Sequence, residues 1–137
     1  MKSDDLRSRT KAFALAVIDL TEKLPRTRAA EVIGRQLLRS GTSVGANYRA
    51  AQRSQSRAAM IAKLSIVEEE ADECCYWLEL LVDSAIVPPA AVESLRREAS
   101  SLTAIVVSSK KTLRGQVPAG RERPSTFDVR RSEAANE

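Results

Sequence analysis

The stretch Met60–Ala85, MIAKLSIVEEEADECCYWLELLVDSA, decides the fold class of this chain. Its small and apolar residues recur at alternating spacings of four and three, which places them on one face of an α-helix. The residues of this apolar seam are Met60, Leu64, Val67, Ala71, Cys74, Leu78, Leu81 and Ala85. A seam of this kind is typical of a helix packed in a bundle, so we expect partner helices on either side.

Three more helices are expected around this stretch, over about 4–24, 28–53 and from Pro88-Pro89 to about 113. Pro25 ends the first, because a residue before proline avoids the α conformation. Ser54–Ser56 supplies a connection and an N-cap for the third helix, and proline suits the first turn of the fourth. The expected apolar positions are Leu6, Phe13, Val17, Leu20 and Leu24; Ile33, Leu37, Ser40, Val44, Asn47 and Ala51; and Val92, Leu95, Ala99, Leu102, Val106, Ser109 and Leu113.

The connections between these segments are short, and short connections make neighbouring helices antiparallel. The sequence therefore predicts an all-α, antiparallel, up-down-up-down four-helix bundle over residues 1–114. Beyond it the periodicity stops, and residues 115–137 hold two glycines, two prolines, four basic and four acidic residues. We expect a disordered, flexible C-terminal tail there.

The composition disfavours catalysis and metal binding. The chain has 137 residues and no histidine, so the usual general base at neutral pH is missing. Its two cysteines, Cys74 and Cys75, are adjacent and cannot bridge each other on a regular helix. We therefore expect no enzyme activity, no catalytic residue, no cofactor and no metal. No segment approaches the roughly 20 apolar residues of a membrane span, and the charged N-terminus resembles no signal segment, which favours a cytoplasmic protein without membrane contact.

Charge is divided unevenly along the chain. Lys23–Lys63 holds nine basic residues and a single acid, Glu31. Leu64–Leu95 holds eight acidic residues and no basic one. The net charge of +4 therefore conceals a basic second helix followed by an acidic third helix.

The arginines of the second helix gather within about 20° of one line at about 100° per residue, opposite the apolar stripe. This arginine ridge consists of Arg28, Arg35, Arg39, Arg53 and Arg57, with Arg49 close by. If the helix continues through residues 41–45, the ridge faces away from the core. Arginine suits phosphate, because its planar fork donates two parallel hydrogen bonds.

Three interpretations of the ridge stay open. It is an ordinary solvated face, or it pairs with the acidic third helix of a neighbouring subunit, or it follows the backbone of RNA or DNA. The last two are compatible in a ring of subunits. Because few aromatic residues accompany the arginines, stacking on bases is not expected, and binding should be backbone-directed and salt-dependent.

Small residues mark another side of the second helix. Gly34, Gly41 and Gly45 are spaced seven and four residues apart, which lets another helix approach closely. We expect Asn47 to form a hydrogen bond across the helix interface and fix its register. A phosphate-binding loop is a weaker interpretation, because the segment lacks the lysine and the preceding strand of such loops.

Two blocks of sequence resemble a known family. They are Gln36–Tyr48, QLLRSGTSVGANY, and Lys63–Ala71, KLSIVEEEA, the latter followed by Tyr76–Leu81, YWLELL. Both are similar to the signatures of the bacterial four-helix bundle proteins called S23 ribosomal protein or 23S rRNA-intervening-sequence protein, over roughly residues 5–114. The resemblance implies a homopentameric bundle without enzymatic activity. It also implies kinship with the accessory variability determinant of diversity-generating retroelements, which binds a reverse transcriptase and nucleic acid.

The leading hypothesis is therefore a homo-oligomeric, pentameric scaffold with affinity for RNA or DNA, as an accessory factor to a reverse transcriptase. The alternative is a self-assembly module whose basic and acidic helices pair between subunits. In both hypotheses the working surface is the arginine ridge, while the glycines and Asn47 serve helix packing.

Overall fold

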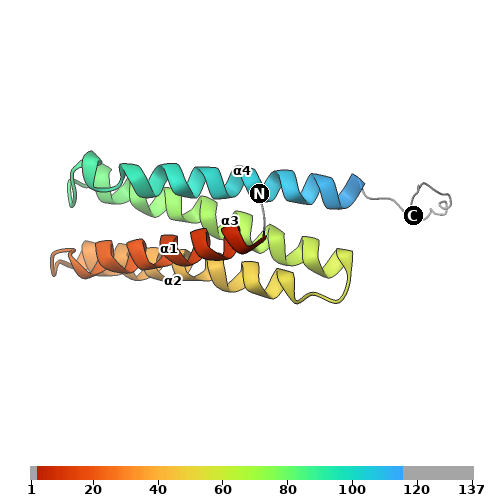
Figure 1. The fold of residues 1–137 in the computed structure, drawn as a ribbon. Coiled ribbons are helices and arrows are strands. Elements are labelled where there is room, and N and C mark those ends of the chain that lie inside the picture. Colours follow the sequence, from red (N-terminus) through yellow and green to blue (C-terminus); the bar gives the residue numbers. More distant parts are fainter. Residues whose placement is uncertain (1–2, 116–137) are drawn as a thin grey trace. The chain divides into compact units, whose positions relative to one another are not determined.

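Within residues 3–115, which the computed structural model describes, four α-helices follow one another along the chain (Figure 1). They are α1 (Ser3–Glu22), α2 (Arg28–Gln52), α3 (Arg57–Asp83) and α4 (Glu93–Gly115), with a 3₁₀ turn η1 (Pro89–Ala91) before α4. The described part contains no strand. The expected all-α, antiparallel four-helix arrangement is confirmed.

Residues up to Val107 form one compact unit, and a second unit begins at Ser108. The bundle discussed below is the first unit, with α4 followed only to Val107. The predicted domain boundary after residue 114 stays a prediction. The predicted tail, apart from Gly115 at the end of α4, lies outside the described residues.

Two side-chain caps start the middle helices. The Thr27 hydroxyl oxygen accepts a hydrogen bond of 3.2 Å from the Ala30 amide at the start of α2. The Ser56 hydroxyl oxygen accepts one of 3.0 Å from the Ala59 amide at the start of α3. Each cap satisfies one of the amides that the first turn of a helix leaves without a partner. The N-cap expected within Ser54–Ser56 is thereby confirmed.

The passage from α3 to α4 differs from the expectation in two respects. The spacing predicts Ala85 on the seam, but α3 ends at Asp83 and Ala85 lies outside the helix with a φ of 60°. Its side chain is exposed. Pro88 was expected to open the fourth helix, but it is extended and precedes the 3₁₀ turn, while α4 begins at Glu93. Two prolines in succession favour this offset, because the residue before each is kept out of the α conformation.

The core receives one apolar stripe from each helix. The seam of α3 is buried from Leu64 to Leu81, as predicted, whereas Met60 at its start is only partly buried. The described core is largely aliphatic, with Phe13 and Tyr48 as its buried aromatic side chains. The largest fully buried side chains are Phe13, Leu37, Leu78, Leu81 and Leu102, followed by the smaller Val17, Val44, Val67, Val92 and Val106.

Helices α1 and α2 approach each other closely where α2 carries glycine. A Cβ atom on Gly41 would lie 2.8 Å from Cγ1 of Val17, and one on Gly45 would lie 3.2 Å from Oγ1 of Thr10. A Cβ on Gly34 would lie 2.9 Å from Cδ1 of Leu24. All three glycines therefore turn toward α1 and the chain that follows it.

Polar contacts also join α1 to α4 and α2 to α3. The Arg9 guanidinium on α1 donates hydrogen bonds of 2.9 and 2.6 Å to the Glu98 carboxylate on α4. Between α2 and α3, the Ser40 hydroxyl lies 3.3 Å from the Cys74 sulfur inside the core. Asn47 does not make the expected bond to another helix. Its amide donates instead to the Ser43 carbonyl at 2.9 Å. Side chains on a helix tilt toward its N-terminus, which brings the Asn47 amide over the carbonyl four residues earlier.

We expect the glycine positions to respond differently to alanine. Gly41→Ala should lower the free energy of unfolding by about 1–2 kcal/mol, because Val17 is fully buried and over-packing costs more than the helix propensity that alanine adds. Gly34→Ala should be neutral or stabilising by up to about 1 kcal/mol, because only the end of the flexible Leu24 side chain must move. Urea denaturation followed by circular dichroism measures both.

A double-mutant cycle provides the control for this contact. The double variant with Val17→Ala and Gly41→Ala should lose less free energy of unfolding than the two single variants lose together. The smaller side chain at position 17 makes room for the new methyl group. Equal losses at Gly41 and Gly34, or simple additivity of the double variant, would contradict the account.

The two cysteines should differ in reactivity. Burial raises the pKa of the Cys74 thiol to about 12, against the opposing hydrogen bond from Ser40. Burial also raises the pKa of Cys75, which is only half-buried. At about pH 8, iodoacetamide should therefore modify a Cys74→Ala variant much faster than a Cys75→Ala variant, because the thiolate is the nucleophile. Mass spectrometry over time measures the two rates, and both should become equal in urea.

The raised pKa of Cys74 also gives a direction to the effect of pH. An unfolded cysteine ionises near pH 8.5, whereas the buried Cys74 thiol stays neutral to a higher pH. Its contribution to stability is therefore complete below about pH 8.5 and is lost as the pH rises toward 12. Equal alkylation rates in the folded single-cysteine variants would contradict this description of the core.

Candidate nucleic-acid interface

The outer face of α2 carries most of its positive charge. The helix is continuous over its 25 residues, so the small-residue segment 40–47 lies inside it and is no loop. Residues that alternate spacings of four and three follow one line along the side opposite the buried stripe. This outer face consists of Arg28, Val32, Arg35, Arg39, Thr42, Ala46, Arg49 and, at the C-cap, Arg53.

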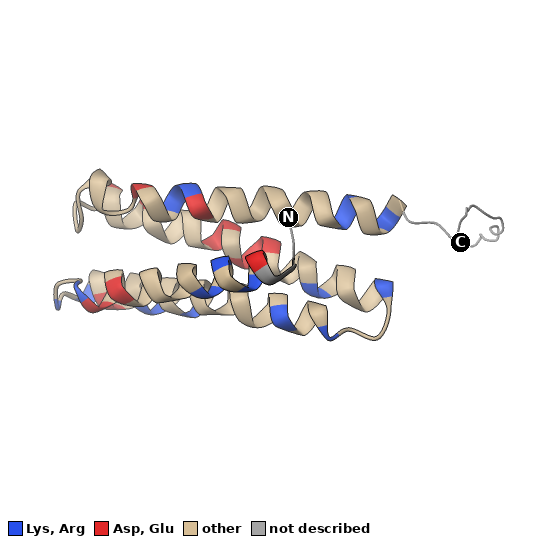
Figure 2. Cartoon of the chain, in the orientation of Figure 1, with Lys and Arg blue, Asp and Glu red and all other residues tan. Residues whose placement is uncertain are grey.

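Most arginines of this face are open to solvent. Arg28, Arg35 and Arg53 are exposed, and Arg49 is partly exposed. Within residues 3–115 none of the four makes an ion pair or a side-chain hydrogen bond. At about 1.5 Å per residue they extend over about 37 Å of helix. Figure 2 shows basic positions at intervals along α2.

Arg39 behaves differently from the other members of the predicted ridge. It reaches α3 of its own chain, where it donates to Glu70 at 3.2 Å and also pairs with Glu73. The Trp77 indole donates to the same Glu73 carboxylate at 2.9 Å. The hydrogen bond that Arg39 donates to Glu73 raises the pKa of Arg39 above its usual value. Arg39 therefore links α2 to α3. The helical periodicity predicted that its side chain would face outward, away from the rest of the bundle.

The predicted ridge also crosses a break in the chain. Arg53 is the C-cap of α2, and Arg57 is the first residue of α3, because Ser56 caps the next helix. The single straight ridge expected from Arg28 to Arg57 is therefore wrong at its C-terminal end. Arg57 is exposed beside the connection between the two helices, and the outer face of α2 ends at Arg53.

The glycine side and the arginine side of α2 have separate surroundings. Gly34, Gly41 and Gly45 lie against α1 or the turn after it, so they face away from the arginine side of the helix. Asn47 is partly buried and bonds within α2. Of the predicted residues, the structure thus leaves the arginines as the group available for contact with another molecule.

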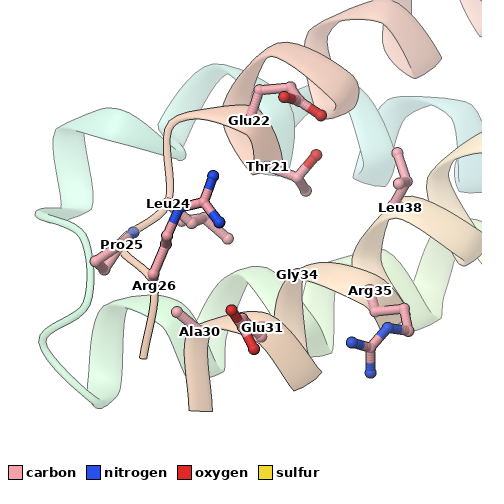
Figure 3. Close-up of a pocket in the computed structure, with 10 residues that line it drawn as sticks. All are labelled: Thr21, Glu22, Leu24, Pro25, Arg26, Ala30, Glu31, Gly34, Arg35 and Leu38. Carbon is pink, nitrogen blue, oxygen red and sulfur yellow. The ribbon is translucent and has the colours of Figure 1, made fainter. Parts of the chain in front are cut away.

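One shallow cavity brings Arg26, which the helical periodicity did not predict, near the arginines of α2. It has a volume of about 430 Å³ and lies where α1, the following turn and α2 meet. Figure 3 shows Arg26 and Arg35 around it, together with the carboxylates of Glu22 and Glu31 and the floor at Gly34. Arg26 precedes the helix, so only the position of the turn brings it near the start of the arginine face.

Neither a metal site nor a membrane span is found in the described part of the chain. In residues 3–115 no three His, Cys, Asp or Glu side chains group in a way that could hold a metal ion. None of the helices there is both long and apolar enough to cross a bilayer. The buried Cys74 and the half-buried Cys75 are free thiols.

These features define a class of protein, the four-helix bundle with a basic outer helix. A sequence model of the family described as 23S rRNA-intervening sequence protein matches residues 4–108. The chain belongs to this family, which confirms the resemblance of its two sequence blocks. No curated protein matches the chain significantly.

A solved structure is similar in both fold and sequence. It is described as a protein with unknown function from the S23 ribosomal protein family of Bacteroides thetaiotaomicron VPI-5482. The two share 36% sequence identity with a TM-score of 0.76, over 81% of this chain and 99% of the other. The family assignment thus rests on sequence and fold together, while the function of the family is not established.

Arg39 should matter for stability and Arg35 should not. Arg39→Ala should lower the free energy of unfolding by about 0.5–1 kcal/mol, because it removes a partly exposed pair with two carboxylates. Arg35→Ala, on the same helix face but without a carboxylate partner in the described residues, should change it by less than about 0.5 kcal/mol. Urea denaturation at low and high salt compares the two. An equal effect of both changes would contradict the separation of their roles.

Proposed function

We propose that the protein is a non-enzymatic, homo-oligomeric scaffold that binds the backbone of nucleic acid through the outer face of α2. The observation that carries this proposal is a line of exposed or partly exposed arginines without carboxylate partners in the described residues. Arginine is favoured at phosphate because its guanidinium stays charged and donates paired hydrogen bonds.

The composition of the face supports contact with the backbone and not with the bases. Its other members are Val32, Thr42 and Ala46, none of which stacks on a base. The one aromatic residue of α2, Tyr48, is buried in the core. Without aromatic platforms, binding depends on phosphate charge, so it should be weakly selective for sequence and should fall steeply with salt.

The family description suggests RNA as the nucleic acid to test first. Its name refers to a sequence that interrupts 23S rRNA, so a structured RNA and a single strand of the same length are suitable probes. The pentameric state and the reverse transcriptase expected from the resemblance remain part of this proposal. We propose that these partners bind the outer face of α2.

Charge reversal on the outer face should abolish RNA binding. The variant Arg28→Glu, Arg35→Glu, Arg53→Glu changes three exposed residues and spares Arg39. The wild type should bind a labelled 30-nucleotide single strand at about 50 mM salt, with a slope of log affinity against log salt near −3 for four phosphates neutralised. Fluorescence anisotropy should show at least a 100-fold loss of affinity in the variant.

A matched variant separates the position of the charges from their sum. Lys11→Glu, Lys63→Glu, Lys111→Glu changes the net charge equally at exposed residues outside α2. It should lose less than about tenfold, because only the long-range attraction is reduced. Absence of wild-type binding at 50 mM salt, or equal losses in both variants, would overturn the nucleic-acid part of the proposal.

A further inference from the structure

The outer face of α3 is an acidic counterpart of the outer face of α2. Its residues alternate spacings of three and four along the side opposite the buried seam. This acidic face consists of Glu69, Asp72, Tyr76, Glu79 and Asp83. Figure 2 shows acidic residues along α3, in contrast to the basic residues along α2.

All five residues of the acidic face are exposed. The four carboxylates make no ion pair or side-chain hydrogen bond within residues 3–115. Such an unpaired row of like charges is unfavourable by itself, because neighbouring carboxylates on one helix face repel each other. An oppositely charged surface would relieve this repulsion.

Tyr76 stands in the middle of the acidic face. It is 52% exposed, although tyrosine is among the residue types that contribute most at protein interfaces. Its ring packs edge-on against Trp77 with the ring centroids 5.0 Å apart, so it is held against its own helix. Aromatic residues are enriched at the centre of contact surfaces between proteins, where polar residues form the rim, and Tyr76 with the carboxylates around it matches this arrangement.

The complement of this face occurs in the chain itself. Four arginines of the outer face of α2 lack partners in the described residues, as do four carboxylates of α3. Both faces follow the same alternating spacing, and two helices with this spacing pack side by side with their side chains interleaved. Val32 and Ala46 on the basic face offer apolar surface to the Tyr76 ring.

The two faces cannot satisfy each other within one chain. Where α2 and α3 touch, Arg39 already pairs with Glu70 and Glu73, which lie on the side of α3 that faces α2. The acidic face lies about 100° further round α3, so its carboxylates point away from the arginines of the same chain. The Arg39 pair nevertheless shows that arginines of α2 and carboxylates of α3 form ion pairs in this fold.

We infer that the acidic face of α3 docks on the outer basic face of α2 in a second copy of the chain. The inference deepens the proposed function and rests on its homo-oligomeric part. Because phosphates and carboxylates then compete for the same arginines, a closed ring, in which every basic face is covered, would have to open at one interface before α2 binds nucleic acid. The acidic face thus limits nucleic-acid binding to copies whose basic face is uncovered.

A charge-exchange experiment on the full chain tests this pairing. The first variant is Arg28→Glu, Arg35→Glu, Arg53→Glu, and the second is Glu69→Lys, Asp72→Lys, Glu79→Lys. Each places like charges on both faces, so each alone should be monomeric, while the wild type is oligomeric at about 100 μM. Light scattering after gel filtration measures the molar mass, and circular dichroism verifies that each variant is folded.

The mixture of the two variants gives the decisive result. Each variant offers the face that the other requires, so in an equimolar mixture the two variants should alternate and regain higher mass, as assemblies with an even number of copies and not as pentamers. A variant with Lys11→Glu, Lys63→Glu and Lys111→Glu should stay oligomeric alone. A monomeric wild type, variants that stay oligomeric, or a mixture that stays monomeric would overturn the inference, and the last would leave a basic surface of another protein as the occupant.

RNA binding by the same proteins separates the inference from the proposed function. The acidic-face variant keeps its arginines, so it should bind the single strand at least as tightly as the wild type. If no protein binds RNA but the mixture assembles, the nucleic-acid proposal fails and the pairing stands. If the wild type is oligomeric and binds RNA but the exchange fails, another surface makes the oligomer and the pairing is wrong.

Discussion

The close contact between α1 and α2 determines what the rest of this fold can present to a partner. Gly41 leaves room for Val17, and a methyl group at this position would come within 2.8 Å of the valine side chain. This contact, together with the burial of Leu37 and Val44, sets the rotation of α2 about its own axis. With one side against α1 and another in the core, the arginines are left on the outside. Helix packing and surface charge are thus two consequences of one arrangement.

Periodicity predicted the fold well because the core follows it. The seam from Leu64 to Leu81 is buried as its spacing indicates, and the caps begin α2 and α3 where Thr27 and Ser56 stand. The errors occur where local backbone conformation overrides the pattern. Ala85 continues the spacing but lies beyond the helix with a positive φ, and the two prolines delay the start of α4. A spacing rule contains no information on either effect.

The candidate surface was predicted less completely than the fold. Helical angles placed Arg57 on the same line although it begins α3, and they could not show which carboxylate lies near which arginine. The spacing therefore groups Arg39 with Arg35, although of these two only Arg39 reaches Glu70 and Glu73. Asn47 was likewise expected to reach across an interface and bonds within its own helix. Such partners depend on how two helices are rotated and shifted, which a single sequence does not specify.

In the proposed function, a negatively charged partner binds the outer face of α2. Phenylglyoxal footprinting tests this claim directly, because the reagent modifies accessible guanidinium groups and mass spectrometry locates them. With RNA bound, Arg28, Arg35 and Arg53 should be protected severalfold relative to the free protein, while Arg97 on α4 should keep its reactivity. Equal reactivity of all four arginines with and without RNA, under conditions where the RNA is bound, would contradict the account.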